Sequence, residues 1–257
     1  MQKQTLQMIS KAQIKKIASY KEAKFRNQDK VFIVEGVKMV DELINSAFEI
    51  EFICALPQWI EANKAIYKRA KNILELREED LKKLSTMKSP NQVLAVVKQQ
   101  TPKEIILEDR LVIVLDQIKD PGNLGTIIRL SHWFGIEDII CSENSVDIYN
   151  PKTIQSTMGS FFRVNITYTN LKKYLKSLPK TYPVYCSVLE GGKNIYNETL
   201  SSQGLIVIGS ESHGISKEVL SEATHLIKIP NFAKGSKAES LNASIAAGII
   251  ISEFKRR

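Results

Sequence analysis

A short run of almost continuously apolar residues, LVIVLD at 111–116, constrains the fold of this chain more than any other segment. A strand with apolar side chains on both faces belongs in a sheet that is covered on both sides, which is typical of parallel α/β sheets. Helix and strand patterns then alternate up to a last helix at 242–255. Further strands are predicted at 136–142, 160–169, 181–189, 204–210 and 224–230. Helices are predicted at 126–135, 150–159, 170–178 and 216–223, and Asn150-Pro151 is a start signal for the second of them. Residues 111–257 are therefore expected to form an α/β domain.

The first hundred residues show a second, shorter alternation of the same kind. Helix patterns and strand patterns alternate there, with helices at 9–26, 37–47, 58–70 and 78–85, and strands at 30–36, 50–56, 72–76 and 91–98. The polar segment 101–110 contains Pro102 and has no clear periodicity, so it is predicted to be a linker. The chain of 257 residues is thus expected to contain a small α/β domain at 1–100 and a second one at 111–257.

The positive charge of the chain is concentrated at its beginning. Eight Lys and Arg residues and two acidic residues give residues 1–30 a net charge of +6, out of +8 for the whole chain. Such a segment is typical of a surface that binds nucleic acid. A solvated basic helix face without a ligand explains the same charge equally well.

The cysteines and the absence of long apolar runs indicate the compartment. Cys54, Cys141 and Cys186 are far apart and odd in number, so they favour neither a disulfide framework nor a metal site. No apolar run is long enough to span a bilayer, and the first residues lack the apolar stretch of a secretory signal. A cytoplasmic protein is therefore expected.

Three polar loops follow predicted strands, at 117–125, 209–216 and 229–242. Ligands of open parallel sheets bind beyond the carboxyl ends of the strands, so these loops are candidate site elements. Each loop alone has an ordinary explanation, since Asn123 and Asn242 are helix-cap types and His213 has no nucleophile paired with it. Three such loops in one domain can nevertheless surround a small polar ligand.

The same loops resemble the signature motifs of a known family. The segments PGNLGTIIR at 121–129, IVIGSESHGIS at 206–216 and IP…ESLNASIAA at 229–247 are similar, in this order, to the three motifs of the SpoU/TrmH class of RNA ribose 2′-O-methyltransferases, within the SPOUT superfamily. The likeness covers about 111–254. Residues 17–46 are similar to the substrate-binding domain that many members carry ahead of the catalytic one.

The resemblance implies a fold and a chemistry that the residue patterns alone do not. The C-terminal part of the second domain would thread into a deep trefoil knot that holds S-adenosylmethionine, without any metal, and two copies would form a homodimer through the knot region. The residues implied for cofactor binding are Gly209, Ile229 and Leu241. The residues implied for catalysis are Asn123, Arg129, Glu211, Ser240 and Asn242.

The implied substrate is RNA, and ribosomal RNA is expected rather than transfer RNA. Arg129 would lie beside the ribose 2′-hydroxyl, either as the base or as the group that binds the adjoining phosphate and orients the hydroxyl. A guanidinium is very hard to deprotonate, which favours the orienting role. The RNA-binding candidates in the first domain are Lys15, Lys16, Lys24 and Arg26.

Two departures and two competing functions accompany this interpretation. Ser212 stands where the family commonly has Gly, and the loop at 231–238 is longer than usual and contains Lys234 and Lys237. A non-catalytic RNA-binding ribosome-assembly factor would explain the basic N-terminus but not the three loops. A nucleotide-dependent dehydrogenase is disfavoured because loop 117–125 lacks the G-x-G-x-x-G spacing.

Overall fold

The computed structural model describes residues 6–233 and 240–256, and it divides into two compact units. The first unit comprises the chain up to Thr101 together with Tyr149–Phe162, and the second comprises Pro102–Ile148 and the chain from Arg163 onwards. Lys234 and Lys237 of the predicted long loop lie outside the described residues.

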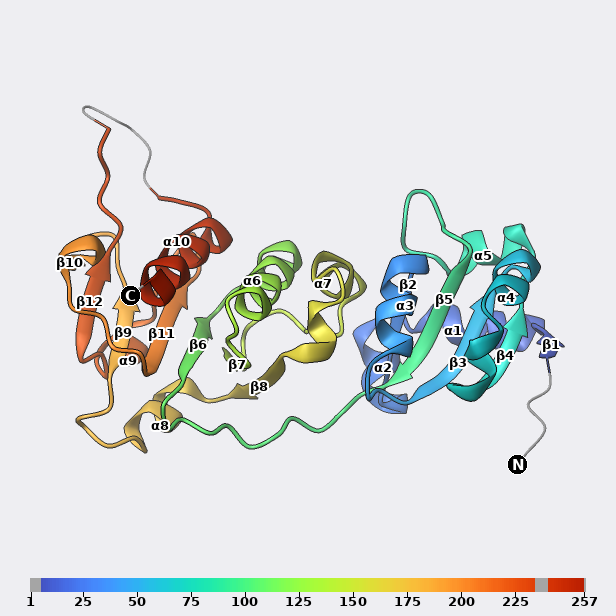
Figure 1. Cartoon of the computed structure of the whole chain (residues 1–257), viewed down its shortest axis with the longest axis horizontal. Coiled ribbons are helices and arrows are strands. Elements are labelled where there is room, and N and C mark those ends of the chain that lie inside the picture. Colours follow the sequence, from blue (N-terminus) through green and yellow to red (C-terminus); the bar gives the residue numbers. More distant parts are fainter. Residues whose placement is uncertain (1–5, 234–239, 257) are drawn as a thin grey trace. The chain divides into compact units, whose positions relative to one another are not determined.

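The first unit is an α/β domain built on a five-stranded sheet of order β1-β4-β3-β5-β2 (Figure 1). Strands β1, β4 and β3 are parallel, whereas β5 is antiparallel to both β3 and β2. Its elements are β1 (Leu6–Met8), α1 (Lys11–Ser19), α2 (Ala23–Asp29), β2 (Val31–Glu35), α3 (Val37–Ile44), β3 (Ile50–Ala55), α4 (Pro57–Ala62), the 3-10 helix η1 (Lys64–Lys68), β4 (Ala70–Glu75), α5 (Glu78–Leu84), β5 (Val93–Lys98), α7 (Pro151–Ser156) and the 3-10 helix η2 (Ser160–Arg163).

Two features of this unit differ from the sequence-based expectation. The helix predicted at 9–26 is divided into α1 and α2, and the Arg26 Nη1 atom donates to the carbonyls of Tyr20 and Lys21 at the division, at 3.0 and 2.8 Å. Residues 149–162, which the sequence places in the second domain, belong to the first unit. The ring of Phe161 lies 5.5 Å from that of Phe32, and this aromatic packing holds the segment.

The second unit contains a seven-stranded sheet of order β10-β12-β9-β11-β6-β7-β8, in which every neighbouring pair is parallel. Its elements are β6 (Leu111–Asp116), α6 (Pro121–Trp133), β7 (Asp138–Ser142), β8 (Asn165–Thr169), α8 (Leu171–Lys176), β9 (Val184–Ser187), β10 (Lys193–Asn194), the 3-10 helix η3 (Ile195–Asn197), β11 (Gly204–Gly209), α9 (Lys217–Leu220), β12 (His225–Lys228) and α10 (Ala243–Arg256).

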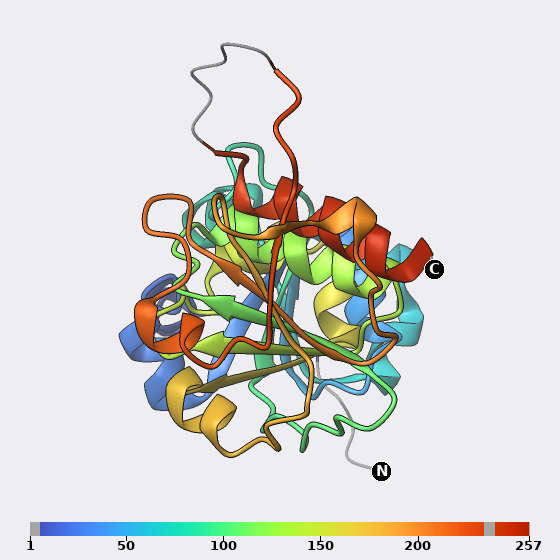
Figure 2. The ribbon, with the colours of Figure 1, turned by 90° about the vertical axis from the view of Figure 1, so that its left-hand side faces the viewer.

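Helices cover both faces of this sheet, as the apolar run at 111–116 predicts. Helices α6 and α10 pack against each other on one face (Figure 2). On the other face, Leu171 and Leu175 of α8 and Val219 of α9 share a buried cluster with Val112 and Val114 of β6. Because side chains alternate along a strand, the central strands bury both of their faces.

The predicted strand at 160–169 is wrong in its first half, since residues 160–163 form η2 and the strand begins at Asn165. The helix predicted from 126 begins five residues earlier, at Pro121, because the Asp120 side chain caps it. Strands β1 and β10 were not anticipated. They have two or three residues each, too few for a period of two to be recognised.

The strand order brings the ends of distant segments together. Strands β6 and β11 are adjacent and parallel, with Asp116 opposite Gly209 at their last residues. The loops that follow these two strands therefore begin at the same edge of the sheet. Strand β12 is separated from β11 by β9 alone, so the loop after β12 starts from this edge as well.

Candidate functional site

The loop after β6 leads into α6, and its cap residue is not Asn123, so the Asn123 side chain can contact other loops. The Asp120 side chain is the cap, because its Oδ1 atom accepts from the backbone N–H of Asn123 at 2.8 Å. Pro121 occupies the first helical position, where its missing N–H costs nothing. Asn123 is therefore a first-turn residue and not the helix cap.

The loop after β11 forms a tight turn that presents Glu211. Ser210 and Gly214 exchange two backbone hydrogen bonds, of 3.1 and 2.9 Å, and Gly214 has a φ of +64°. The turn folds back so closely on Gly209 that a Cβ atom there would lie 2.2 Å from the carbonyl carbon of Gly214. Only glycine fits at position 209 for this reason.

Asn242 caps the last helix and also reaches the other two loops. Its Oδ1 atom accepts from the backbone N–H groups of Ser244 and Ile245, at 3.0 and 3.3 Å. Its Nδ2 atom donates to Asn123 Oδ1 at 3.0 Å and to Glu211 Oε1 at 3.4 Å. Ser240 and Asn242 are both residue types that cap helices, and the structure shows that Asn242 is the cap of α10.

Glu211 is the centre of this polar cluster. Its Oε1 atom accepts from Asn123 Nδ2, Asn242 Nδ2 and the backbone N–H of Ala243. The last of these donors belongs to the first turn of α10, where a negative charge is favourable. The Oε2 atom has no hydrogen bond to another residue that the structure describes, so it remains an acceptor.

Arg129 is not part of this hydrogen-bonded cluster. It lies on α6, six residues beyond Asn123, which corresponds to about 9 Å along the helix axis. Its side chain is exposed, and within residues 6–233 and 240–256 it has no hydrogen-bond or ion-pair partner. An exposed guanidinium without a partner among the described residues is available for an incoming anion.

Two cavities lie beside the polar cluster and share a wall. The smaller, of about 400 Å³, is lined by Gly209, Glu211 and His213 among others, and the larger, of about 830 Å³, is lined by Ile229 and Pro230 among others. Ser240 and Leu241 line both. All three residues implied for cofactor binding, together with Ser240, therefore line this pair of adjoining cavities.

Sequence reasoning missed the loop after β9, whose residues 187–189 line both cavities. No motif marks this segment. The signal that would have identified it is the position of β9 next to β11 in the sheet, which depends on strand order and not on a local pattern. The backbone N–H of Ala243, which binds Glu211, was missed for the same reason.

The basic residues of the first unit have unequal surroundings. Lys15 and Lys24 are exposed, and the Lys24 Nζ atom lies 5.8 Å from the centroid of the Phe25 ring. Arg26 is only 2% exposed, and its guanidinium is engaged by backbone carbonyls. The expectation that Arg26 contacts RNA does not fit this burial, because a phosphate would have to displace those carbonyls.

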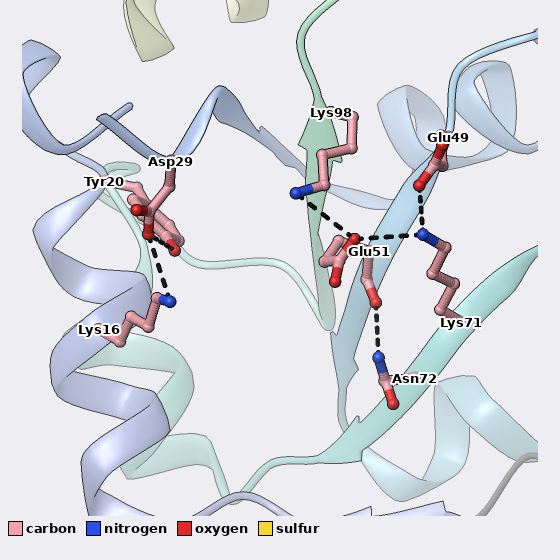
Figure 3. Close-up of polar contacts among 8 residues, drawn as sticks. All are labelled: Lys16, Tyr20, Asp29, Glu49, Glu51, Lys71, Asn72 and Lys98. Carbon is pink, nitrogen blue, oxygen red and sulfur yellow. Dashed lines mark hydrogen bonds and ion pairs between the residues drawn. The ribbon is translucent and has the colours of Figure 1, made fainter. Parts of the chain in front are cut away.

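Lys16 is held by an ion pair with Asp29, at 3.3 Å (Figure 3). The Tyr20 hydroxyl donates to the same carboxylate at 2.7 Å. This hydrogen bond, with the help of Lys16, lowers the pKa of Asp29, while burial and the contact with Asp29 raise the pKa of Tyr20. On the sheet beside them, Glu51 interacts with Lys71 and Lys98 at 3.7 and 3.8 Å. Several cations of this unit are therefore already compensated.

The cysteines are not candidates for nucleophilic chemistry. Cys54, Cys141 and Cys186 are buried and form no disulfide. Burial raises the pKa of all three thiols, that of Cys141 and of Cys186 to about 12. The thiolate is the reactive form of cysteine, so these three thiols are expected to be unreactive near neutral pH. Within the described ranges, no helix is long and apolar enough to cross a bilayer.

Comparison with known proteins gives consistent matches over the whole chain. The model of the SpoU rRNA methylase family matches residues 110–252, and that of the MRM3-like substrate binding domain matches residues 11–95. The chain is 26% identical to the 23S rRNA (guanosine(2553)-2′-O)-methyltransferase RlmP of Bacillus subtilis, over 96% of this chain and 98% of that protein.

Solved structures give the same picture. A TrmH-family protein from Porphyromonas gingivalis has a TM-score of 0.87 and 35% identity, and the match covers 97% of this chain and 99% of that one. An rRNA methyltransferase from Sinorhizobium meliloti with bound AdoMet has a TM-score of 0.86 and 26% identity, with 98% of each chain covered.

Proposed function

Because this chain belongs to the SpoU rRNA methylase family, as its three motifs predict, we propose that it transfers the methyl group of S-adenosylmethionine to a ribose 2′-hydroxyl of ribosomal RNA. The observation that carries the proposal is the hydrogen-bonded cluster of Asn123, Glu211 and Asn242 beside two adjoining cavities that share lining residues. The relative RlmP, which matches almost the full length of this chain, is named for this reaction on 23S rRNA.

The hollow at the strand ends fits the cofactor. Its two cavities, of about 400 and 830 Å³, are of the size that small-molecule sites usually have. Gly209 has no side chain, and the small residues Ala243 and Ala246 line the wall, so a ligand can approach the backbone closely. We assign cofactor binding to Gly209, Ile229 and Leu241. The cofactor supplies an already activated methyl group, so its chemistry requires no metal.

The residues of the polar cluster would position the ribose. Glu211 is held at Oε1 by three donors, which leaves Oε2 to accept a hydrogen bond from a ribose hydroxyl. Asn123 and Asn242 donate to the carboxylate and fix it in place, and Ser240 lines the cavity beside it. A prepositioned acceptor at the reacting hydroxyl aligns it for attack and helps to remove its proton.

We assign Arg129 to the phosphate next to the target ribose. Its exposure and its lack of a partner among the described residues support this role, since a guanidinium binds phosphate through two parallel hydrogen bonds. A role as general base would require deprotonation of a guanidinium, which proteins do not achieve. Arg129 therefore orients the substrate, and Glu211 is the better acceptor of the proton.

The first unit would hold the RNA through Lys15, Lys16 and Lys24. The match of residues 11–95 to a substrate binding domain supports this assignment. Phosphate contacts of this kind give affinity that falls with salt, but they do not choose a sequence. Transfer RNA is the alternative substrate, and the names of the relatives favour ribosomal RNA over it.

A homodimer, a knot and a cytoplasmic location complete the proposal. Trp133 on α6 and Ile245 on α10 are 83% and 55% exposed, and a second copy would cover them. We assign the trefoil knot that the resemblance implies to the C-terminal part of the second unit, where α10 contacts β11 although β12, the strand before it, is separated from β11 by β9. Three unpaired buried cysteines favour a reducing compartment. Sedimentation equilibrium tests the dimer, and a single monomeric species would refute it.

The function is tested by mapping 2′-O-methyl marks on total RNA from cells with and without the gene. One ribosomal nucleotide should lose its mark in the deletion strain and regain it with the wild-type gene. The purified protein should also bind S-adenosylmethionine in a calorimeter. A complete set of marks in the deletion strain, together with no heat of binding, would instead support a non-catalytic assembly factor.

A further inference from the structure

A third cavity, of about 270 Å³, lies where β6, β7 and β8 end, and among the described residues it shares no lining with the two cavities of the candidate site. Ten of its twelve lining residues are polar or charged, and Leu171 and Val219 are the apolar ones. Sites for drug-sized molecules are usually lined mostly by apolar residues and have volumes of about 300–1,000 Å³. This smaller, polar cavity instead suits one compact ligand that is recognised through hydrogen bonds.

Asp116, the last residue of β6, brings a buried acceptor to this cavity. It is 2% exposed, and its Oδ2 atom accepts from the backbone N–H of Ser216 at 2.8 Å. Its Oδ1 atom has no hydrogen-bond donor within residues 6–233 and 240–256. A buried carboxylate oxygen that has lost water without gaining a donor is costly. Asp116 Oδ1 is therefore suited to a ligand that carries an N–H group.

Gln117 joins Asp116 in the same cavity because its backbone is left-handed, with a φ of +56°. Successive side chains of an extended strand point to opposite faces, so the two would otherwise diverge. The Gln117 N–H donates to Ser142 Oγ at 2.8 Å, which holds this turn. The Gln117 side-chain amide has no partner among the described residues. Such strain is common where a binding site needs a fixed geometry.

We propose that this cavity takes the base of an unpaired guanine nucleotide of the RNA substrate. The inference rests on the proposed function, which makes RNA the substrate. The Watson–Crick edge of guanine presents the acceptor O6 beside two donors, N1–H and the N2 amino group. The Gln117 amide donates to O6 and Asp116 Oδ1 accepts from N1–H. Proteins that read single-stranded RNA commonly bind this edge of a base.

The other bases match this pair of side chains less well. Adenine and cytosine have a ring nitrogen acceptor where guanine has N1–H, and this acceptor would face the Asp116 carboxylate. Uracil has its N3–H between two carbonyl oxygens, so it offers no second donor. Guanine alone presents one acceptor and two adjacent donors, and the carboxylates of Glu143 and Glu218 in the lining are further acceptors for its amino group.

The charges of the lining argue against a phosphate group or a metal ion inside the cavity. Its charged residues are three acids, Asp116, Glu143 and Glu218, and one cation, Lys172. This balance repels a phosphate. In the part of the chain that the structure describes, no three His, Cys, Asp or Glu residues are grouped as metal ligands. Lys172 is exposed and is suited to the phosphate of the bound nucleotide.

The cavity and the polar cluster are built by the same two loops. Asp116 and Gln117 begin the segment that leads to Asn123, and Glu218 follows the turn that presents Glu211. A guanine held in the cavity therefore fixes the register of the RNA strand relative to Glu211. Phosphate contacts carry no sequence information, whereas contacts with a base edge do. This cavity thus supplies sequence selection, which the lysines of the first unit do not.

The test measures binding of 5′-GMP, 5′-AMP and 5′-UMP by ligand-observed NMR, with S-adenosylhomocysteine present to fill the proposed cofactor site. The variants are Gln117→Gly, Asp116→Asn and, as a control, Asp109→Gly. Glycine adopts a φ of +56° without strain, so Gln117→Gly removes the amide and keeps the turn. Asp109 is exposed, has a φ of +54° and lines none of the three cavities, so its variant makes the same change elsewhere.

The wild type and Asp109→Gly should bind 5′-GMP about tenfold more tightly than the other two nucleotides, within the range for base discrimination by a good pair of hydrogen bonds. Gln117→Gly and Asp116→Asn should lose this preference. A thermal midpoint of Gln117→Gly that equals or exceeds that of the wild type, as relief of strain predicts, shows that the loss is not due to unfolding.

Several results would overturn the proposal. Equal binding of the three nucleotides by the wild type excludes a guanine site, and so does a preference for 5′-GMP that survives in Gln117→Gly. Calorimetric binding of MgCl₂ alone that is lost in Gln117→Gly would make the cavity a cation site instead. A wild type that prefers 5′-GMP but does not bind S-adenosylhomocysteine supports the guanine site and counts against the proposed function alone.

Discussion

Replacing Gly209 by alanine would place a Cβ atom inside the backbone of the loop that follows β11. The added atom would lie 2.2 Å from the carbonyl carbon and 2.3 Å from the carbonyl oxygen of Gly214, and 2.4 Å from the backbone nitrogen of Ile215. Ordinary contacts of a Cβ atom begin at 3.4 Å. Backbone atoms cannot rotate away as the end of a side chain can, so the loop itself must shift by about 1 Å.

The cost of this shift can be built from its parts. Forcing an extra methyl group into a packed region costs about 1–3 kcal/mol. The two hydrogen bonds between Ser210 and Gly214 would weaken, at about 0.5–1.5 kcal/mol each if they are lost. We therefore expect Gly209→Ala to lower the free energy of unfolding by about 2–6 kcal/mol, with the upper end reached if both hydrogen bonds are lost. Because Glu211 lies in the same loop, binding of S-adenosylhomocysteine should be lost as well.

Gly248→Ala is the matched control for this experiment. The nearest atom to a Cβ at position 248 is Leu130 Cδ1 at 3.4 Å, an ordinary contact with a flexible side chain. Position 248 lies inside α10, where alanine is favoured over glycine by up to about 1 kcal/mol. The same chemical change should thus stabilise the protein slightly at 248 and destabilise it strongly at 209.

The assay is urea unfolding followed by far-UV circular dichroism, with amide hydrogen exchange to localise the effect. Exchange of residues 204–216 should accelerate in Gly209→Ala and stay unchanged in Gly248→Ala. If Gly209→Ala unfolds at the same urea concentration as the wild type, the close approach of the loop to β11 is not a packing constraint. Position 209 would then tolerate a side chain, and glycine would not be required there.

Three further substitutions test separate parts of the structure. Arg129→Ala should abolish methyl transfer and leave cofactor binding nearly intact. An activity assay and calorimetry with S-adenosylhomocysteine on the same variant test this. Full activity of the variant would exclude Arg129 from the active site. Asp29→Asn should make the thermal midpoint of the first unit less sensitive to acid. The pKa of Asp29 is lowered in the folded state, mainly by the hydrogen bond from the Tyr20 hydroxyl. The resulting stabilisation is present above the unfolded-state pKa and is lost as the pH falls through the folded-state pKa. Thermal melts from about pH 5 downwards measure this, and parallel curves for variant and wild type would contradict it. Glu35→Ala should destabilise the first unit by about 1–3 kcal/mol, because two buried donors would lose their acceptor. The Glu35 carboxylate accepts from Ser85 Oγ at 2.6 Å and from the backbone N–H of Thr86 at 2.9 Å. A melting temperature like that of the wild type would show that water replaces the carboxylate as the acceptor.

Much of the fold follows from local patterns in the sequence. The apolar runs at β6 and β11 predict buried strands because a parallel sheet covered on both faces needs apolar side chains on both sides. Asn150 followed by Pro151 predicts the start of α7, because Asn150 caps the first turn of the helix and Pro151 occupies its first position. The start of α6 was missed by five residues because Asp120, a capping side chain three residues before Asn123, was not recognised as the cap.

Other features depend on contacts that no local pattern reports. Arg26 looks like a surface cation in a basic helix, yet it is buried because the chain turns at Tyr20 and the guanidinium binds the freed carbonyls. Residues 149–162 look like a part of the second domain, yet their aromatic rings pack in the first unit. Both errors have the same cause: burial is decided by partners that are distant in sequence.

Local patterns and family motifs in the sequence point to polar groups that follow apolar strands or start a helix, among them Asn123, Glu211 and Asn242. That these three side chains meet follows from the tertiary fold alone. Asn123 and Glu211 are 88 residues apart, and Asn123 and Asn242 are 119 apart. Their contacts depend on β11 pairing with β6 and on α10 packing against α6. Strand order and helix packing are set by the burial of the whole apolar surface, so no stretch of sequence contains them on its own.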